Sequence, residues 1–435
     1  MMYYSTNGRA PRATLEKAVI KGLPEDRGLY MPERIPRLPD SFFASIQDMD
    51  FHEIACVVAD SLFGEDIGKD ELHAIVRDSL SFDCPVVRVS EAIWALELFH
   101  GPTLAFKDVG ARFMARLLRH FSEGEDLNVL VATSGDTGSA VANGFLGVEG
   151  IHVFVLYPQG KVSPIQECQF TTLGRNVTAL EIEGVFDDCQ ALVKSAFMDE
   201  GLNSAMRLTS ANSINVARFL PQSFYYFWAY AQMKRAGLAD RLVVSTPSGN
   251  FGNLCAGLIA KRMGLPVARF IAANNANDVF YDYLRSGIYA PRPSIPTLAN
   301  AMDVGDPSNF ARILALYGHD WEAVKADISG ATFPDEQIAG TIREVYRRSG
   351  YLCDPHGACG YQAVSDGLRP GETGVFCETA HPAKFKDTIA EILGMTPEIP
   401  GRLKAFMDGK KESIVLPNDF STFKRFLSEH HFSKC

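Results

Sequence analysis

The chain has 435 residues, of which 46% are hydrophobic and 22% are charged, as in ordinary globular proteins. This length is too great for one compact core and predicts two or three domains. The formal net charge is −10 at pH 7, and no run of like charge stands out. An acidic chain of this kind argues against a nucleic-acid partner, because a phosphate backbone requires a basic surface.

The N-terminal stretch MMYYSTNGRAPRATLEK lacks the apolar segment of a signal peptide, and no apolar run is long enough to predict a transmembrane helix. The nine cysteines show no CxxC spacing, and the histidines form no HExxH or paired Cys/His pattern. We therefore expect a cytoplasmic protein with reduced thiols, no membrane partner and no metal site.

The first 85 or so residues predict a mainly helical region. Residues 14–22, TLEKAVIKG, have helical spacing, and a turn-rich stretch with four prolines follows. Two amphipathic segments near residues 49–63 and 69–80 predict further helices.

From about residue 125, apolar strands alternate with helical segments. Helices are expected over residues 140–145, from Ser163-Pro164 onwards, and from Asp187 onwards. This alternation predicts a parallel α/β architecture, in which ligands bind beyond the carboxyl ends of the strands. The predicted strands are 127–132, 151–157, 176–182, 241–247, 267–274 and 374–379.

Lys107 lies in HGPTLAFKDVGARF, behind an apolar run and ahead of an amphipathic segment. Pressed against Leu104, Ala105 and Phe106, its amine would lose hydration and become a nucleophile. On an exposed helix face, the same lysine would only add solubility. Residues elsewhere in the chain must decide between these two interpretations.

Three polar loops follow predicted strands. SGNFGN at 248–253 could hold an anion on backbone N–H groups at a helix N-terminus, or it could be a glycine-rich turn with an Asn cap. TSGDTGSA at 133–140 could hold a small carboxylate or simply cap a helix. Thr379 follows a buried strand at the same sheet edge, and a histidine beside a proline, such as His381, is more often structural than catalytic.

A fourth polar stretch, NSINVAR at 212–218, gathers amides, a hydroxyl and a guanidinium. The fork of Arg218 suits a phosphate, although an ordinary surface arginine would give the same pattern. A desolvated lysine, an anion-binding loop without basic residues and a second polar loop together fit one cofactor, pyridoxal 5′-phosphate (PLP). PLP needs an amine for its Schiff base, a cup for its phosphate and a partner for its ring nitrogen.

The motifs HGPTLAFKD, TSGDTGSA, SANSINVAR, SGNFGN and ETAHPAKF, in this order, closely resemble those of the threonine synthase family. The N-terminal residues YYSTNGRAPRATLEKAVIKGLPEDRGLYMPERIP also resemble that family. The resemblance implies a two-lobed α/β PLP fold of the tryptophan-synthase-β type with parallel sheets, plus a mainly helical N-terminal domain. It implies a boundary between residues 1–90 and a catalytic region, 91–435, with the cofactor between its two lobes.

The resemblance also implies conversion of O-phospho-L-homoserine and water to L-threonine and phosphate, by a monomer or homodimer. Lys107 matches the lysine of the Schiff base, which serves γ-elimination of phosphate and addition of water at Cβ. The implied cofactor-binding residues are Lys107, Asp136, Ser248, Gly249, Asn250, Phe251, Gly252, Asn253 and Thr379. The implied substrate-binding residues are Thr133, Ser134, Gly135, Thr137, Ser213, Asn215 and Arg218.

Two positions depart from the family pattern. Many relatives carry Asn where this chain has Asp136, so that a carboxylate would face the phenolic oxygen of the cofactor. Either one of the two groups is protonated, or Asp136 points elsewhere. Asn7 stands where a basic residue is expected, in a motif that could contact substrate or a second subunit.

Two other functions stay open at this point. A related phospho-lyase would use the same lysine and anion cup but release 2-oxobutyrate, phosphate and ammonia. A non-catalytic metabolite binder could retain the scaffold, although it would have no reason to keep the amine of Lys107.

Overall fold

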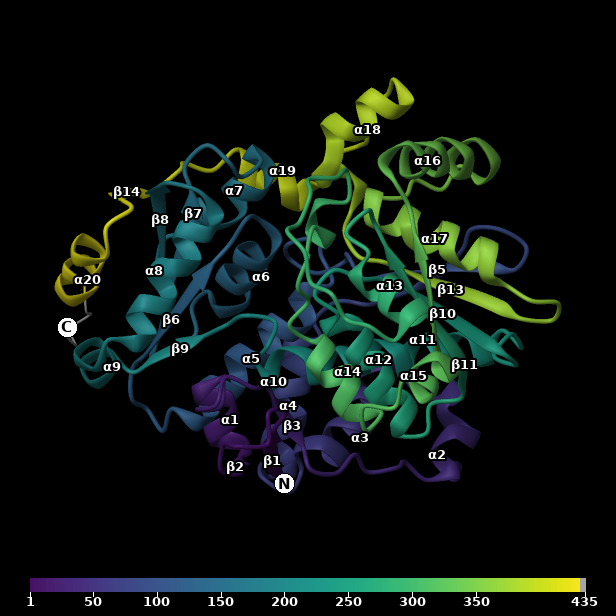
Figure 1. Ribbon diagram of the computed structural model, residues 1–435, viewed down its shortest axis with the longest axis horizontal. Helices are drawn as coiled ribbons and strands as arrows, with labels where there is room; N and C mark the ends of the chain where they lie inside the picture. Colours follow the sequence, from purple (N-terminus) through teal and green to yellow (C-terminus); the bar gives the residue numbers. More distant parts are fainter. Residues whose placement is uncertain (431–435) are drawn as a thin grey trace.

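The computed structural model describes residues 1–430 (Figure 1). Residues 2–79 form a small antiparallel sheet of order β2-β1-β3 and four α-helices, at the bottom of that view. Asp50 and Glu53 form a reciprocal capping box that starts α3, and its buried face includes Ile54, Val58 and Leu62. The elements are β1 (Met2–Ser5), β2 (Ala13–Thr14), α1 (Leu15–Lys21), β3 (Tyr30–Pro32), α2 (Asp40–Ser45), η1 (Ile46–Asp48), α3 (Phe51–Phe63) and α4 (Lys69–Ser79).

One lobe is built on a five-stranded parallel sheet of order β14-β8-β7-β6-β9. All six residues of β6 are buried, as expected for a parallel sheet covered on both faces. The strands are β6 (Leu127–Ala132), β7 (Ile151–Pro158), β8 (Val177–Glu183), β9 (Leu208–Ser210) and β14 (Ile414–Pro417). The helices are α6 (Asp136–Phe145), α7 (Pro164–Thr171), α8 (Phe186–Met198), α9 (Glu200–Met206) and α20 (Phe420–Glu429).

The other lobe has a six-stranded sheet of order β12-β11-β10-β13-β5-β4, in which only β4 is antiparallel. Its strands are β4 (Val86–Arg88), β5 (Ile93–Glu97), β10 (Leu242–Pro247), β11 (Val267–Asn274), β12 (Ile328–Thr332) and β13 (Thr373–Glu378). Its helices are α12 (Gly252–Arg262), α13 (Val279–Ser286), η3 (Asn300–Met302), α14 (Phe310–Leu316), α15 (Trp321–Asp327), α16 (Asp335–Ser349), α17 (Pro355–Gly367), η4 (Pro382–Phe385) and α18 (Lys386–Leu393).

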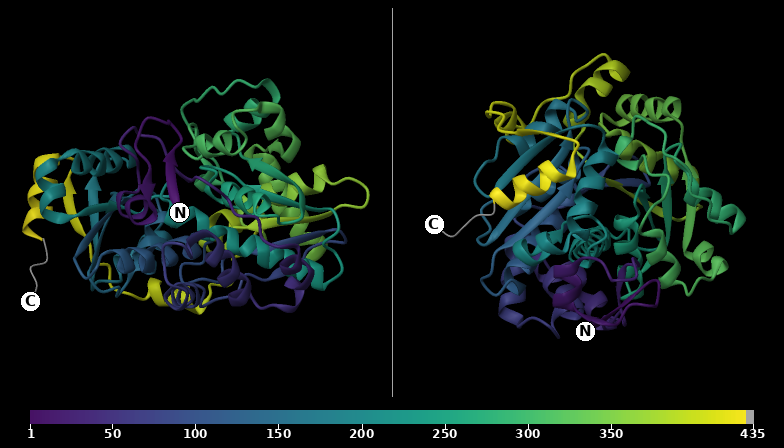
Figure 2. Two further views of the ribbon diagram at one scale, coloured as in Figure 1. Left: turned by 90° about the horizontal axis from the view of Figure 1, so that it is seen from below. Right: turned by 60° about the vertical axis from the view of Figure 1, so that its left-hand side comes forward.

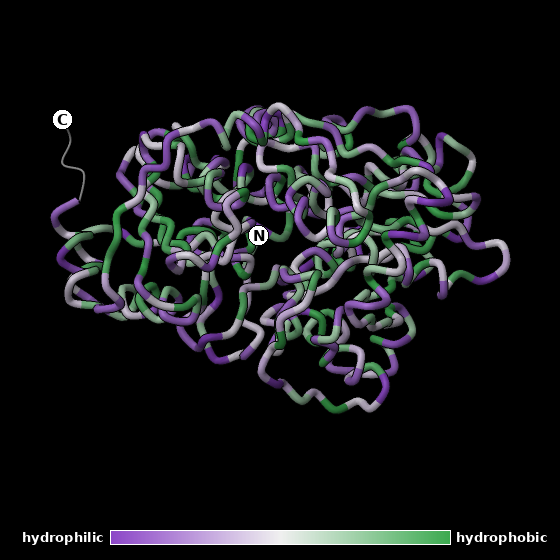
Figure 3. The backbone as a smooth tube through the Cα atoms, turned by 90° about the horizontal axis from the view of Figure 1, so that it is seen from above, coloured by the Kyte–Doolittle hydropathy of each residue, from purple (hydrophilic) through white to green (hydrophobic). Residues whose placement is uncertain are grey.

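Central helices join the two lobes and the N-terminal region. Helix α5 lies between the two sheets in Figure 1, and α11 is buried on nearly all sides, as its aromatic sequence predicts. One apolar cluster runs from the N-terminal region through α5, α11 and α12 into both lobes, and Figure 3 shows the apolar chain segments lying mainly inside the molecule. The remaining helices are α5 (Lys107–Phe121), α10 (Val216–Phe219), η2 (Leu220–Gln222), α11 (Ser223–Arg235) and α19 (Gly401–Met407).

The C-terminal segment leaves the six-stranded lobe and returns to the other one, as the yellow ribbon in Figure 2 shows. Strand β14 pairs in parallel with β8. Helix α20 contributes Phe423 and Leu427 to an apolar cluster with Leu192 and Val193 of α8. The last strand and helix of the chain therefore complete a lobe whose other strands end near residue 210.

The predicted two-lobed α/β fold with parallel sheets is confirmed, and the six predicted strands agree with the structure to within one residue. Helix α6 begins at Asp136 rather than at residue 140, because Asp136, Thr137 and Gly138 already belong to its first turn, after the N-cap Gly135. The sequence analysis missed β4, β5, β9, β12, β14 and the N-terminal sheet, whose strands are only two to five residues long.

The hairpin β4–β5 begins before residue 91 and already belongs to the six-stranded sheet. We therefore propose that the N-terminal domain ends near residue 83 rather than at residue 90.

No helix in residues 1–430 has the length and apolar character needed to cross a membrane. The eight cysteines in these residues are free thiols, whereas Cys435 lies outside the described residues.

Candidate active site

Lys107 is the first residue of α5, at the junction of the two lobes. Its amine makes no hydrogen bond or ion pair with any described residue, and the ring centroid of Phe106 lies 5.8 Å from Nζ. The pKa of Lys107 is lowered, because burial disfavours its charged form and the cations of Lys384 and Arg218 lie nearby; the carboxylate of Asp136 opposes this shift. The amine is therefore easier to deprotonate than an ordinary lysine, as its apolar neighbours predict.

Thr379 reaches Lys107 because the segment after β13 pairs with the segment before α5. The backbone N–H of Phe106 donates to the carbonyl of Thr379 (2.9 Å), and the N–H of His381 donates to the carbonyl of Leu104 (3.1 Å). The buried Thr379 hydroxyl forms no hydrogen bond with another described residue. The structure thus brings together these two predicted site residues from distant parts of the sequence.

The SGNFGN loop ends β10 and starts α12. Phe251 has a left-handed backbone (φ +61°), which turns the chain into the helix. The backbone N–H groups of Gly249 through Gly252 donate to no described residue, so they are free to bind an anion. Ser248 and Asn253 support this loop: the Ser248 hydroxyl donates to the Thr246 carbonyl (2.7 Å), and Asn253 Oδ1 accepts from two tyrosine hydroxyls.

Asn250 links the SGNFGN loop to the NSINVAR stretch. Its Nδ2 donates to Ser213 Oγ (2.8 Å), while its Oδ1 accepts from the N–H of Ser308 (2.7 Å). The Asn309 side chain donates to the Asn250 carbonyl (2.8 Å). Ser213 therefore lies beside the SGNFGN loop.

The loop before α6 is held by Thr133 and Gly135. The Thr133 hydroxyl accepts from the N–H groups of Gly135 (2.9 Å) and Gly138 (2.8 Å). Gly135 has φ +150°, and a Cβ there would lie 2.5 Å from Gln166 Oε1. Ser134 is exposed and Thr137 is half-buried, so these two side chains remain available to a ligand.

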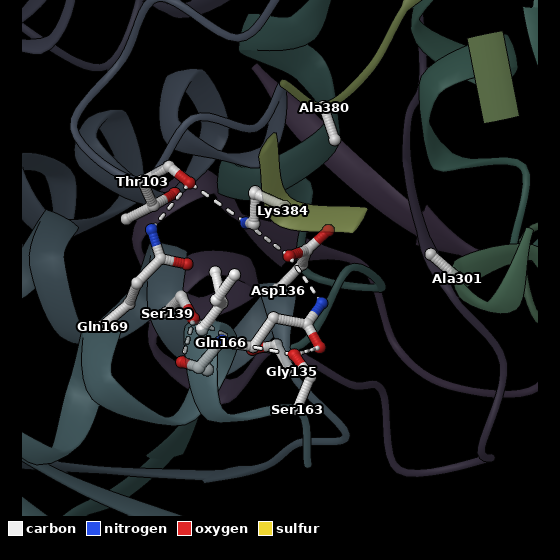
Figure 4. Close-up of polar contacts among 12 residues, drawn as sticks. Thr103, Gly135, Asp136, Ser139, Ser163, Gln166, Gln169, Ala301, Ala380 and Lys384 are labelled. Carbon is white, nitrogen blue, oxygen red and sulfur yellow. Dashed lines mark hydrogen bonds and ion pairs between the residues drawn. The ribbon is translucent and has the colours of Figure 1, made fainter. Parts of the chain in front are cut away.

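Asp136 is buried, and its charge is compensated. Its Oδ1 accepts from Gln166 Nε2 (3.0 Å) and lies 2.5 Å from Lys384 Nζ (Figure 4). Burial alone would raise the pKa of Asp136, but the charges of Lys384 and Lys107 and these hydrogen bonds hold it well below its usual range. Asp136 is therefore ionised in this structure, and its negative charge acts on Lys107.

Asn215 and Arg218 are both buried. The side chain of Asn215 donates to the Val19 carbonyl (2.8 Å) and accepts from the N–H of Ala217 (3.0 Å), so it joins α10 to the N-terminal domain rather than facing a ligand. Arg218 donates to the Ala211 carbonyl, and its Nε has no hydrogen-bond partner among the described residues. Burial lowers the pKa of Arg218 to about 10, which still leaves it charged at neutral pH.

Comparisons with known proteins agree with this arrangement. Family models match residues 83–377 (pyridoxal-phosphate dependent enzyme), 2–80 (threonine synthase N terminus) and 357–427 (threonine synthase, C-terminal). The threonine synthase of Escherichia coli is 43% identical over 99% of this chain and 100% of that protein. The chain belongs to the threonine synthase family. The crystal structure of the same E. coli enzyme superposes with a TM-score of 0.92.

A PLP-bound threonine synthase from Brucella melitensis, 36% identical, has a TM-score of 0.93 and is matched over the full length of both chains. The residues of this family member fit PLP on their own evidence. They supply a primary amine without a partner, a row of unused N–H groups and the free hydroxyl of Thr379. PLP is accordingly the cofactor of this threonine synthase family member.

Sequence reasoning missed several residues that support the site, including Lys384 and Gln166. It also missed a buried chain of contacts beside Thr379. The N–H of Ala380 donates to Asp354 (3.3 Å), which contacts His356 Nδ1 (2.5 Å), and His356 Nε2 accepts from the N–H of Ala301 (3.1 Å). A Cβ on Gly249 would lie 2.7 Å from Met302 Cα and 2.9 Å from the Ala301 carbonyl oxygen, so this chain of contacts connects the ends of β13 and β10. The Asp-Pro-His sequence that starts α17 was the available signal.

His381 has the structural role that the sequence favoured. Its Nδ1 accepts from the N–H of Ala383 (3.1 Å) and caps η4. Burial lowers the pKa of His381 to about 4, so the ring is neutral near pH 7.

Asn7, the second departure from the family pattern, donates from Nδ2 to the Asp26 carbonyl (3.0 Å) and stabilises an N-terminal turn.

Proposed function

We propose that this protein is a threonine synthase that converts O-phospho-L-homoserine and water into L-threonine and phosphate. One observation carries the proposal. The free amine of Lys107, the free N–H groups of SGNFGN and the hydroxyl of Thr379 meet in a chain that matches threonine synthases over its whole length. The family match does not favour the phospho-lyase alternative.

PLP, when bound, draws electrons from the bonds at the substrate's α-carbon and so makes protons at Cα and Cβ easier to remove. Lys107 Nζ is the base that we assign to both positions, since its lowered pKa provides a neutral amine nearer to physiological pH. The desolvated surroundings of Lys107 limit the access of water to the reacting carbons.

We assign the cofactor phosphate to the N–H groups of Gly249 through Gly252 and the ring nitrogen to the Thr379 hydroxyl. Asp136 faces the phenolic edge of the cofactor. Ser134 and Thr137 are assigned to the substrate carboxylate because their side chains are available, whereas Thr133 and Gly135 shape that loop.

For the substrate phosphate, we assign Ser213 and Arg218. Ser213 lies beside the SGNFGN loop, and Arg218 has an unpaired, buried Nε that an anion would satisfy. Asn215 supports this region through Val19 instead of binding substrate. We further propose that the protein works in the cytoplasm as a monomer or homodimer.

Product analysis tests the proposed function. Purified protein loaded with PLP and given O-phospho-L-homoserine should release threonine and phosphate in equal amounts. Release of 2-oxobutyrate and ammonia would instead support the phospho-lyase, and PLP binding without turnover of any amino acid would support a binder. Lys107→Ala should lower turnover by at least about 10³-fold. Lys194→Ala, at an exposed lysine on α8, serves as the matched control.

A further inference from the structure

Lys384 is the most deeply buried lysine near the proposed cofactor site, and its side chain is fully inaccessible to solvent. Its Nζ lies 2.5 Å from Asp136 Oδ1 and donates to the Thr103 carbonyl at 3.0 Å (Figure 4). A buried ammonium without a counter-charge would be strongly unfavourable, so Lys384 and Asp136 depend on each other.

The contacts of Lys384 join three segments of the chain. Lys384 belongs to η4, after the last strand of the six-stranded sheet, whereas Asp136 starts α6 in the other lobe. Thr103 lies in the loop that leads to Lys107, and Gln169 also donates to its carbonyl (3.0 Å). The Nζ of Lys384, in one lobe, therefore contacts Asp136 of the other lobe and the loop that leads to Lys107.

Asp136 is oriented by this pairing. In Figure 4, the dashed lines from Lys384 and Gln166 both end on Oδ1, and the second oxygen of Asp136 carries none. The groups whose charges act on Lys107 are Asp136 from α6, Lys384 from η4 and Arg218 from α10. The Asp136 anion raises the pKa of the Lys107 amine and the Lys384 cation lowers it, so the two members of the pair oppose each other.

We infer that Lys384 is a positioning residue of the active site, which keeps Asp136 ionised and oriented beside Lys107 and fastens the two lobes across the cofactor position. The inference rests on the proposed function, because it takes PLP to be bound at Lys107. The Asp–Lys pair is neutral overall, so the buried carboxylate of Asp136 is compensated within the site.

The test is a pH titration of the visible absorbance of bound PLP in the holoenzyme. Lys384→Met removes a cation, and Asp136 then depends on the positive charge at the Lys107 nitrogen alone to stay ionised. This charge is held more tightly by the unpaired carboxylate, so the titration midpoint should rise by about one pH unit or more. Asp136→Asn removes the anion and should lower the midpoint. The double variant Asp136→Asn/Lys384→Met removes both charges and should return to within about half a unit of the wild type. Lys404→Met, at an exposed lysine on α19, should leave the midpoint unchanged.

A merely structural role for Lys384 predicts a different pattern. The two single variants would then lower the melting temperature without opposite shifts of the midpoint, and the double variant would not restore it. The inference would be overturned if the two single variants did not shift the midpoint in opposite directions, or if the double variant did not restore it. If Lys384→Met does not fold, as judged by circular dichroism, Asp136→Asn and the double variant still supply the comparison.

Turnover separates this inference from the proposed function. Opposite midpoint shifts in a protein that makes no threonine would support the pairing and overturn the proposed activity. Unshifted midpoints in a protein that makes threonine would overturn the pairing alone.

Discussion

Gly135 has a backbone conformation (φ +150°, ψ −101°) that only glycine adopts at little cost. Thr133 fixes this conformation from one side, and Gln166, which also holds Asp136, fills the space where a Cβ would project. The loop that presents Ser134 and Thr137 therefore requires glycine at position 135, because a Cβ there would collide with Gln166.

Gly135→Ala should accordingly displace Gln166, cost about 1–3 kcal/mol of stability and lower kcat/KM for phosphohomoserine by roughly 10-fold or more. Thermal unfolding and steady-state kinetics measure the two effects. Gly340→Ala is the control: a Cβ at Gly340, inside α16, meets no atom within 4 Å, so alanine there should stabilise by up to about 1 kcal/mol. Equal behaviour of the two variants would contradict this account of the loop.

Some residues of the candidate site could be predicted from the sequence, and others could not. Lys107 and the SGNFGN glycines could be predicted, because their chemistry is expressed in contiguous residues. The partner of Asp136 could not, because Lys384 reaches it only after both lobes have folded. A buried carboxylate requires a counter-charge, and the lysine of ETAHPAKF was the nearest signal in the sequence. The contact between the Asn215 side chain and the Val19 carbonyl could not be predicted either, because it joins residues 196 positions apart in the sequence.

Single elements depend on polar residues at their ends, as the cap of η4 shows. His381 accepts from Ala383 only while its ring is neutral. Its pKa in the folded protein is about 4, below its ordinary value of 6.5, because burial outweighs the carboxylates of Glu97 and Asp354. The unfolded chain therefore binds this proton more tightly, and the contribution of His381 to stability is present above pH 6.5 and lost as the pH falls towards 4.

His381→Asn retains an acceptor at the cap but does not titrate. Between pH 6.5 and 4, the melting temperature of the wild type should fall more steeply than that of the variant. Differential scanning calorimetry across this range measures both slopes. Parallel curves would show that His381 does not titrate as described.

Helix α10 is tied to helix α1 of the N-terminal domain through Asn215. Asn215→Ala removes an N-cap and leaves the buried Val19 carbonyl unpaired, which should cost about 2–3 kcal/mol. We expect a lower melting temperature and faster proteolysis within residues 1–80. Asn212→Ala, at a half-buried neighbour whose side chain makes no hydrogen bond with a described residue, should change neither property.

At the scale of the whole molecule, the lobes are not contiguous in sequence. Strand β5 and strand β13 are neighbours in one sheet, and β8 and β14 in the other. The interior strands were predictable because long apolar runs are typical of buried parallel strands. Strand β14 was not, because it is a four-residue edge strand with exposed Ile414 and Val415, and its pairing depends only on the tertiary structure.

Phe423 fastens α20 to the five-stranded lobe and is completely buried. Phe423→Ala should therefore destabilise this attachment by about 3–5 kcal/mol and release a C-terminal fragment on limited proteolysis. Val415→Thr, on the exposed side of β14, should stay within about 0.5 kcal/mol of the wild type. Equal protease resistance of the two variants would contradict the role of Phe423.

Because β14 comes from the end of the chain and pairs with β8 of the five-stranded lobe, this lobe is completed late in synthesis. A chain that leaves the ribosome from its N-terminus can form β6, β7, β8 and β9 early, but the edge of β8 stays unpaired until residues 414–417 are made. Over that interval a row of backbone N–H and C=O groups is open to strands of other chains. The edge of β8 is therefore covered only when the final segment of the chain has been made and has folded back onto the five-stranded lobe.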